Sequence, residues 1–282
     1  MTTDPLLQRL SGLPWPRPAL DLPEPTAGQF WRAAWEKTAC LVVLLGPPRG
    51  RVVPVAAASS EAVGDETTVL AATEDGLSPA VWGSVTGSIK LFALEHRIAD
   101  LTVEAFAAVR DAVAGTAPGR WAPIDNVLDD RTLVRAQLVE GIERLAEAEW
   151  VPQASGRTLA EQAAAAGIDV PEVYRALGVP PGDARNLLLG RRPVRPEEKG
   201  PLTELLGTAP EEGFSYDEEL MMAIDQPQRR ARMERQERAG VWTDPVALRR
   251  ALAETVLPMA ARMRGQAHRD WGALVDEVLD AD

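Results

Sequence analysis

The chain has 282 residues, of which 45% are hydrophobic, and a formal net charge of -12. This length accommodates one large domain or two to three modest ones. The single cysteine, Cys40, excludes an intrachain disulfide and a cysteine-based metal site. The N-terminus lacks a signal-peptide pattern, and the apolar runs are shorter than the roughly 20 residues that a membrane span needs. We therefore expect a globular cytoplasmic protein without membrane contact.

The N-terminal part of the chain is predicted to contain an arm and a β domain. Residues 1–26 are proline-rich and favour an extended arm. Residues 27–115 contain six β-favouring runs separated by turn formers, and a trailing helix that Thr102 is expected to cap. The runs cover residues 30–35, 39–45, 51–57, 67–72, 80–85 and 88–94. Because no insert of helix length separates them, they predict a small antiparallel β-barrel of the SH3-like type.

The remainder is predicted to be helical, so the expected fold class is α+β multidomain. A connecting helix is expected within 124–150, starting at Asp130 or Thr132. A second domain is expected at 157–208, and a C-terminal helical region at 214–282. The expected division is therefore an arm, a β domain, a connecting helix and two further helical parts.

Residues 157–208 carry the most informative motif. Thr158-Leu-Ala-Glu161 and Asp169-Val-Pro-Glu172 are two capping boxes that predict the starts of successive helices. Gly178 is expected to end the second helix with a positive φ, and Gly190 is expected to close the third. With Arg191-Arg192-Pro193 following, the segment resembles the lambda-repressor-like (Xre-type) helix-turn-helix family.

This resemblance implies a DNA-binding transcriptional regulator whose third helix enters the major groove. Arg185 and Asn186 would read guanine and adenine edges, and Asp183 would stand beside them. Phosphate contacts are expected from Arg191, Arg192 and Arg195. Since the family binds paired half-sites of double-stranded operator DNA, we expect a homodimer without cofactor or metal. Its interface is expected in the C-terminal region, at Leu248, Leu252, Val256, Met259 and Leu274.

Other features of the same segment favour a protein-interaction adaptor that has lost DNA binding. Residues 151–208 carry seven basic and seven acidic side chains, although non-specific DNA affinity comes from phosphate neutralisation. Asp183 would repel phosphate. Leu188 and Leu189 occupy positions that are usually polar in the family, and they would suit a protein interface.

The β domain resembles the MazF/PemK toxin family, whose small barrel cleaves RNA without metal. The resemblance rests on Gly28-Gln29-Phe30-Trp31, on the run from Arg51 to Ser60, and on the run from His96 to Thr102. In that family an arginine followed by proline ahead of the second strand supplies the catalytic charge. This chain has Glu36-Lys37-Thr38-Ala39 there.

We therefore predict no catalytic residue, and expect the barrel to bind a protein partner or a signal. The alternative is a metal-independent endoribonuclease toxin fused to its own regulator. Ser59 or Ser60 would then supply the hydroxyl, and Arg49, Arg51 or Lys37 the charge.

Overall fold

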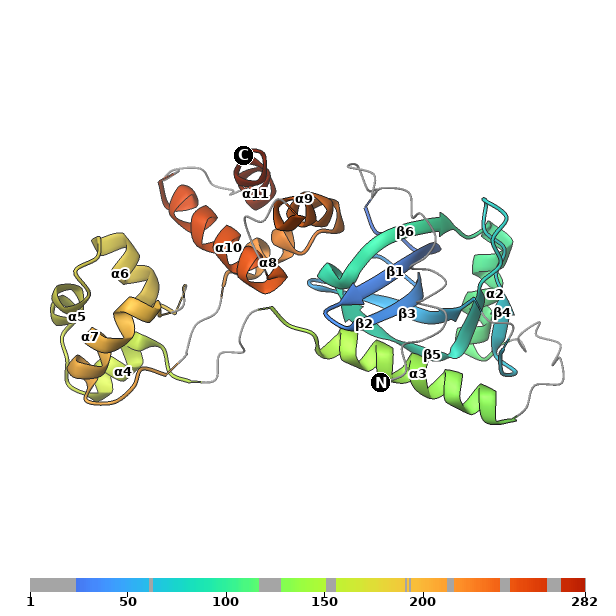
Figure 1. Cartoon of the computed structure of the whole chain (residues 1–282), viewed down its shortest axis with the longest axis horizontal. Helices are drawn as coiled ribbons and strands as arrows, with labels where there is room; N and C mark the ends of the chain where they lie inside the picture. Colours follow the sequence, from blue (N-terminus) through green and yellow to red (C-terminus); the bar gives the residue numbers. More distant parts are fainter. Residues whose placement is uncertain are drawn as a thin grey trace. The chain divides into compact units, whose positions relative to one another are not determined.

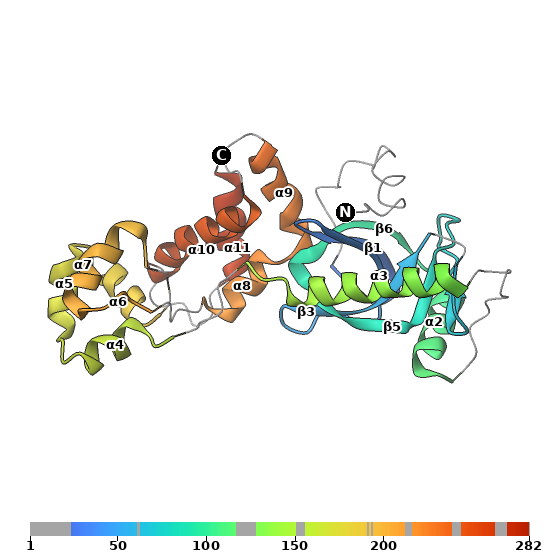
Figure 2. The same cartoon turned by 60° about the horizontal axis from the view of Figure 1, so that its bottom comes forward.

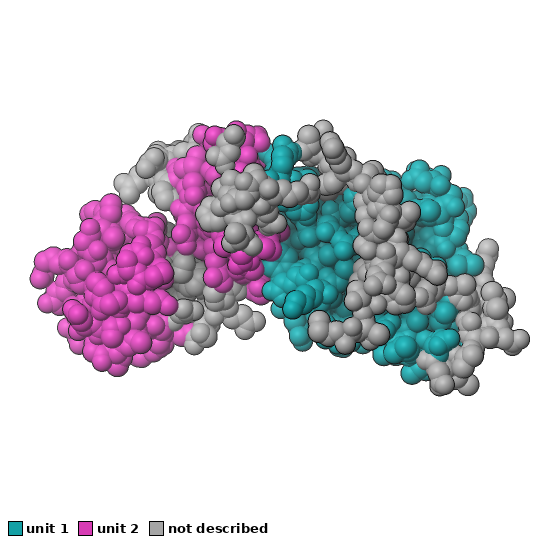
Figure 3. All heavy atoms as spheres, in the orientation of Figure 1, with its two compact units in different colours: residues 1–148, 225–235 teal, residues 149–224, 236–282 magenta. Residues whose placement is uncertain are grey.

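The computed structural model describes residues 24–60, 63–116, 128–150, 156–190, 192, 194–211, 216–238, 244–262 and 270–281. Most of the predicted proline-rich arm, residues 1–23, lies outside this set. The chain has mixed α+β structure and divides into two units (Figure 3). Unit 1 comprises residues 1–148 and 225–235, and unit 2 comprises residues 149–224 and 236–282. Residues 225–235, expected in the C-terminal helical region, thus belong with the sheet.

Unit 1 is built on a six-stranded antiparallel sheet in the order β4-β5-β3-β2-β1-β6. The strands are β1 (Gln29–Trp35), β2 (Thr38–Leu44), β3 (Val52–Ser59), β4 (Thr68–Leu70), β5 (Ala80–Lys90) and β6 (Leu94–Asp100). β1 and β2 are joined by the two-residue turn Glu36–Lys37, in which Glu36 has a φ of 51°. The predicted antiparallel sheet is confirmed.

The sheet is not closed into a barrel. Its outer strands, β4 and β6, form no ladder with each other. The residues that follow them meet only at the isolated bridge between Thr73 and Leu101, flanked by hydrogen bonds from Glu74 N to Asp100 O and from Thr102 N to Ala72 O. The strands therefore form an open sheet, and the expected closed barrel is not formed.

The last strand differs from the prediction. β5 continues to Lys90, and β6 starts only at Leu94 and runs through His96. Between them, the short 3-10 turn η1 (Leu91–Ala93) is entirely buried. The apolar run 88–94 was predicted as one strand. Its residues are apolar because they are buried, and a buried turn has the same composition as a buried strand. The more polar β6 is an outer strand, where polar side chains are tolerated and limit edge-to-edge pairing.

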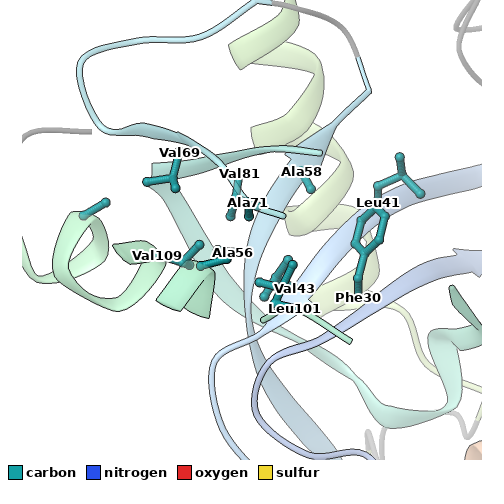
Figure 4. Close-up of a cluster of buried hydrophobic side chains, with 12 residues drawn as sticks. Phe30, Leu41, Val43, Ala56, Ala58, Val69, Ala71, Val81, Leu101 and Val109 are labelled. Atoms are coloured by element: carbon teal, nitrogen blue, oxygen red, sulfur yellow. The ribbon is translucent and has the colours of Figure 1, made fainter. Parts of the chain in front are cut away.

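The helix α2 (Val103–Ala114) completes the core on one side of the sheet. The side chain of Thr102 accepts a hydrogen bond from Ala105 N, as predicted for its N-cap. Figure 4 shows the buried cluster, with Val109 of α2 beside Ala56 of β3. The whole cluster consists of Phe30, Leu41, Val43, Ala56, Ala58, Val69, Ala71, Val81, Leu101, Ala105, Val109 and Ala112. Its many alanines allow α2 to approach the strands closely.

The long helix α3 (Leu128–Glu147) packs against β5, β2 and β3, along the sheet (Figures 1 and 2). One glycine in α3 and one in β5 permit this close approach. A Cβ atom at Gly141 of α3 would lie 2.2 Å from Cys40 Sγ, and one at Gly87 of β5 would lie 2.6 Å from Ile142 Cγ2. The buried Cys40 is thus a packing residue under α3.

Substituting Gly141 tests this contact. We expect Gly141→Ala to lower the free energy of unfolding by about 1–2 kcal/mol, because overpacking outweighs the gain in helix propensity. Removing the opposing sulfur should reverse the loss, so that Gly141→Ala in a Cys40→Ala background is neutral or stabilising. Urea denaturation of the four proteins in this double-mutant cycle measures the coupling. Equal losses in both backgrounds would refute the assigned contact.

The remaining helices of the described residues are α4 (Leu159–Ala165), α5 (Val170–Leu177), α6 (Pro181–Leu188), α7 (Pro196–Leu206), α8 (Glu218–Ile224), α9 (Pro227–Arg238), α10 (Pro245–Arg262) and α11 (Trp271–Asp280). In unit 2, α8, α10 and α11 pack against one another. None of the helices in the described ranges combines the length and apolar character needed to cross a membrane.

The residues expected at a dimer interface lie inside this three-helix group. Leu248, Leu252, Val256 and Leu274 are buried, and Met259 is half-buried. Each belongs to α10 or α11, which pack together within one chain. These side chains therefore form an intramolecular core, because an apolar stripe is satisfied equally well by a neighbouring helix of the same chain.

Candidate nucleic-acid interface

The helices α4 and α5 start at the two predicted capping boxes, and α5 ends at the predicted Gly178. Thr158 and Glu161 form the first capping box, with Thr158 N 2.7 Å from Glu161 Oε2. Asp169 N donates to Glu172 Oε2 at 3.1 Å in the second. Gly178 ends α5 with a φ of 63°, in the left-handed region that only glycine adopts readily. Local sequence thus determines how α5 turns into α6.

The core beneath these helices fixes which face of α6 is outward. It consists of Leu159, Ala163, Val173, Leu187, Leu188 and Leu202. Leu188 was expected on the outer face, but its exposed fraction is 4%. Leu189, just after the helix, is 44% exposed. Ala184, Leu187 and Leu188 therefore face inward, whereas Arg185 is exposed and Asn186 half-exposed.

A buried ion network holds α6 to α7. The Arg192 side chain is only 4% exposed, and its Nη1 and Nη2 atoms lie 2.7 and 2.6 Å from the two Glu198 carboxylate oxygens. Its Nε atom lies 3.0 Å from Asp183 Oδ1. Arg195 Nη1 is 3.4 Å from Asp183 Oδ2. We call Asp183, Arg192, Arg195 and Glu198 the α6–α7 ion network.

The charges within this network shift its pKa values. Burial alone would raise the pKa of Glu198, but hydrogen bonds from Arg192 and from the Arg195 backbone hold that pKa below its usual range. Burial would lower the pKa of Arg192, and its bonds to Glu198, with the charges of Glu198 and Asp183, raise it instead. Both groups are therefore charged at neutral pH, and bidentate pairing fixes their geometry.

The network changes the interpretation of two predicted DNA-contacting residues. The Arg192 guanidinium is directed at carboxylates of its own chain and is covered, so it is a structural residue. Asp183, expected to repel phosphate, has its charge balanced by Arg192 and Arg195. Arg195 remains partly exposed, and Arg191 lies outside the described residues.

Sequence reasoning missed the role of Glu198. The one available signal was a glutamate three residues after Arg195, at the N3 position of α7, where capping boxes place an acidic residue. Glu198 does accept from Arg195 N at 2.9 Å. Its contact with the second partner, Arg192, depends on how α7 folds back toward α6. The spacing of residues in the sequence does not predict that contact.

Among the residues considered for RNA cleavage, Arg51 lies far from Ser59. Arg51 lies just before β3, with its Nε 2.7 Å from Asp225 Oδ2, whereas Ser59 is buried at the opposite end of that strand. Eight strand residues at about 3.3 Å each separate them by roughly 25 Å, too far to act on one phosphate. Lys37 lies in the turn between β1 and β2, at the end of the sheet where Ser59 and Ser60 also lie, since Leu41 pairs with Ala58. Arg49 and Ser60 are exposed.

No family model matches the chain, and no curated protein does. One similar solved structure is an endoribonuclease in complex with its cognate antitoxin from a mycobacterial species. The match has a TM-score of 0.28 and 15% sequence identity, and it covers 33% of this chain and 93% of that chain.

Proposed function

We propose that the chain is a DNA-binding transcriptional regulator of the Xre type, in which α4 to α7 form a helix-turn-helix domain. One observation carries the proposal. α6 buries Ala184, Leu187 and Leu188 and presents Arg185 and Asn186 outward, directly after the glycine turn that ends α5. A helix presented in this way is able to enter a major groove and contact base edges.

The proposed contacts are divided by chemistry. Arg185 would bond guanine O6 and N7, and Asn186 would bond adenine N6 and N7. Arg195 and Arg191 would contact phosphates and fix the register without reading sequence. Arg192 is left out of this set, since it supports α6 from within through Asp183 and Glu198. In this account the sheet of unit 1 is not catalytic and binds a partner or a signal.

Arg185 is the residue on which specific binding should depend most. We expect Arg185→Ala to weaken binding to the preferred duplex by about 10- to 100-fold, because a bidentate contact to guanine contributes about 1–3 kcal/mol of discrimination. Binding to unrelated duplexes should change far less. Fluorescence anisotropy with labelled duplexes at several salt concentrations measures both effects.

Arg157→Ala is the matched control, because it removes the same charge from an exposed arginine. Arg157 lies directly before α4 and pairs with Glu211. It should leave specific binding nearly unchanged. If Arg157→Ala and Arg185→Ala weaken binding equally, the contact assigned to Arg185 is wrong.

The exposed Leu189 and the net charge of -12 favour a second candidate, a protein-interaction adaptor. An exposed apolar side chain at the end of α6 would suit a protein surface better than a phosphate backbone. Absence of salt-sensitive duplex binding by the wild-type chain would support the adaptor and exclude the regulator.

A further inference from the structure

Leu189 lies on the same stripe of α6 as the two residues proposed to read bases. Residues three, four and seven apart share one face of a helix, so the stripe opposite the buried side consists of Gly182, Arg185, Asn186 and Leu189. Leu189 follows α6 as its C-cap, yet its φ of -80° and the hydrogen bond from Leu189 N to Arg185 O at 3.0 Å continue the helical turn. The stripe therefore ends in an apolar side chain.

The protein core does not account for this leucine. Leu187 and Leu188 fill the inner side of α6, whereas Leu189 is 44% exposed. Within the described ranges, Leu189 is not among the partly buried apolar side chains that pack against this core. A single exposed leucine is common on protein surfaces. What distinguishes Leu189 is its alignment with Arg185 and Asn186 on the face proposed to contact DNA.

The dimensions of α6 allow the whole stripe to face base pairs. Its eight residues at about 1.5 Å each give a length of about 12 Å, close to the width of the major groove. Leu189 lies four residues beyond Arg185, a rise of about 6 Å, and successive base pairs are about 3.4 Å apart. When Arg185 contacts a guanine, Leu189 therefore faces a base pair about one or two steps away.

Only one kind of group in the major groove suits a leucine. The side chain has neither a donor nor an acceptor, so it forms no hydrogen bond to phosphates or to the polar edges of bases. Thymine is the one base that presents an apolar group in this groove, its C5-methyl. Contact between a leucine and that methyl removes apolar surface of both from water, which is favourable.

We propose that Leu189 is a third base-reading residue of α6, and that it recognises the C5-methyl group of a thymine about one or two base pairs from the guanine contacted by Arg185. This role rests on the proposed function, and it assigns Leu189 to DNA instead of to a protein partner. The preferred DNA site then combines a guanine, an adenine and a thymine, each read by one side chain of the stripe.

Replacing thymine with uracil removes only the methyl group, so it isolates this contact. The probes are duplexes of the sequence that the full-length wild-type chain selects from a random library, with each thymine replaced in turn by deoxyuridine. We expect one replacement near the guanine to weaken wild-type binding by about three- to tenfold in fluorescence anisotropy, as expected for one methyl group. Leu189→Ser, whose side chain is too short to reach the methyl, should bind the thymine and uracil duplexes within about twofold of each other.

Leu133→Ser is the matched control, because it makes the same change at an exposed leucine of α3. It should show the full wild-type loss with the uracil duplex. Equal losses in wild type and Leu189→Ser, or no loss in wild type at any thymine, overturn the role of Leu189. A selected sequence without a thymine near the guanine does the same. In these three cases DNA binding that depends on Arg185 leaves the proposed function standing, whereas a wild-type chain that binds no duplex overturns both.

Discussion

Replacing Arg192 with methionine is expected to lower the free energy of unfolding by about 3–5 kcal/mol, because it leaves the Glu198 carboxylate buried without its bidentate partner. The Arg192 and Glu198 side chains are each only 4% exposed, so water cannot replace the lost donors. The loss should be seen in urea denaturation followed by far-ultraviolet circular dichroism. It should also loosen α6 against α7, since Asp183 loses a partner at the same time.

Two controls separate the ion network from simple loss of packing. The double variant Arg192→Met/Glu198→Met should recover most of the stability, because apolar replacement of a whole buried pair is often neutral. The pKa of Glu198 is lowered from 4.5 in the folded chain, so its stabilisation is present above pH 4.5 and is lost as the pH falls below it. The difference between wild type and Arg192→Met should therefore shrink in acid. A difference that stays constant would contradict the network.

A second large effect is expected at Gly83 of β5, where α2 approaches the sheet. A Cβ atom at this position would lie 2.9 Å from the carbonyl oxygen of Thr67 and 3.0 Å from the carbonyl carbon of Ala112. Both are backbone atoms, so relief requires moving α2 or the chain before β4. We expect Gly83→Ala to lower the free energy of unfolding by about 1–3 kcal/mol.

Gly182→Ala is the matched control for Gly83→Ala. Gly182 lies in α6 and has no atom within 4 Å of its ideal Cβ position, so alanine should be neutral or stabilise by up to about 1 kcal/mol. Thermal unfolding of both variants measures the contrast. Equal stability of Gly83→Ala and wild type would show that α2 does not lie as close to β5 as described.

The parts of the structure that the sequence predicted are those with local causes. Thr102, Thr158 and Asp169 cap helices because capping depends on residues within one turn. Gly178 and the strands β1 to β3 follow equally local rules of turn chemistry and strand composition. Local patterns therefore predicted most elements and several of their ends.

The parts that the sequence did not predict depend on distant partners. In the sequence, an arginine that contacts phosphate looks the same as one that pairs with a carboxylate of its own chain. For Arg192, only the position of Glu198 in the fold distinguishes the two roles. Arg230 belongs to an arginine-rich segment that resembles a solvated helix face, yet its partners lie in β1 and η1. The burial of Leu188 was also not predicted, because a shift of one residue around a helix moves a side chain from the exposed face to the buried face.

Selection from a random library of DNA duplexes by the full-length chain tests the central claim most directly. The wild-type chain is predicted to enrich one sequence motif that contains a guanine, and Arg185→Ala is predicted to lose the preference at that guanine while keeping the rest of the motif. Enrichment of no sequence by the wild-type chain, or of an identical motif by Arg185→Ala, would contradict the claim that α6 reads DNA.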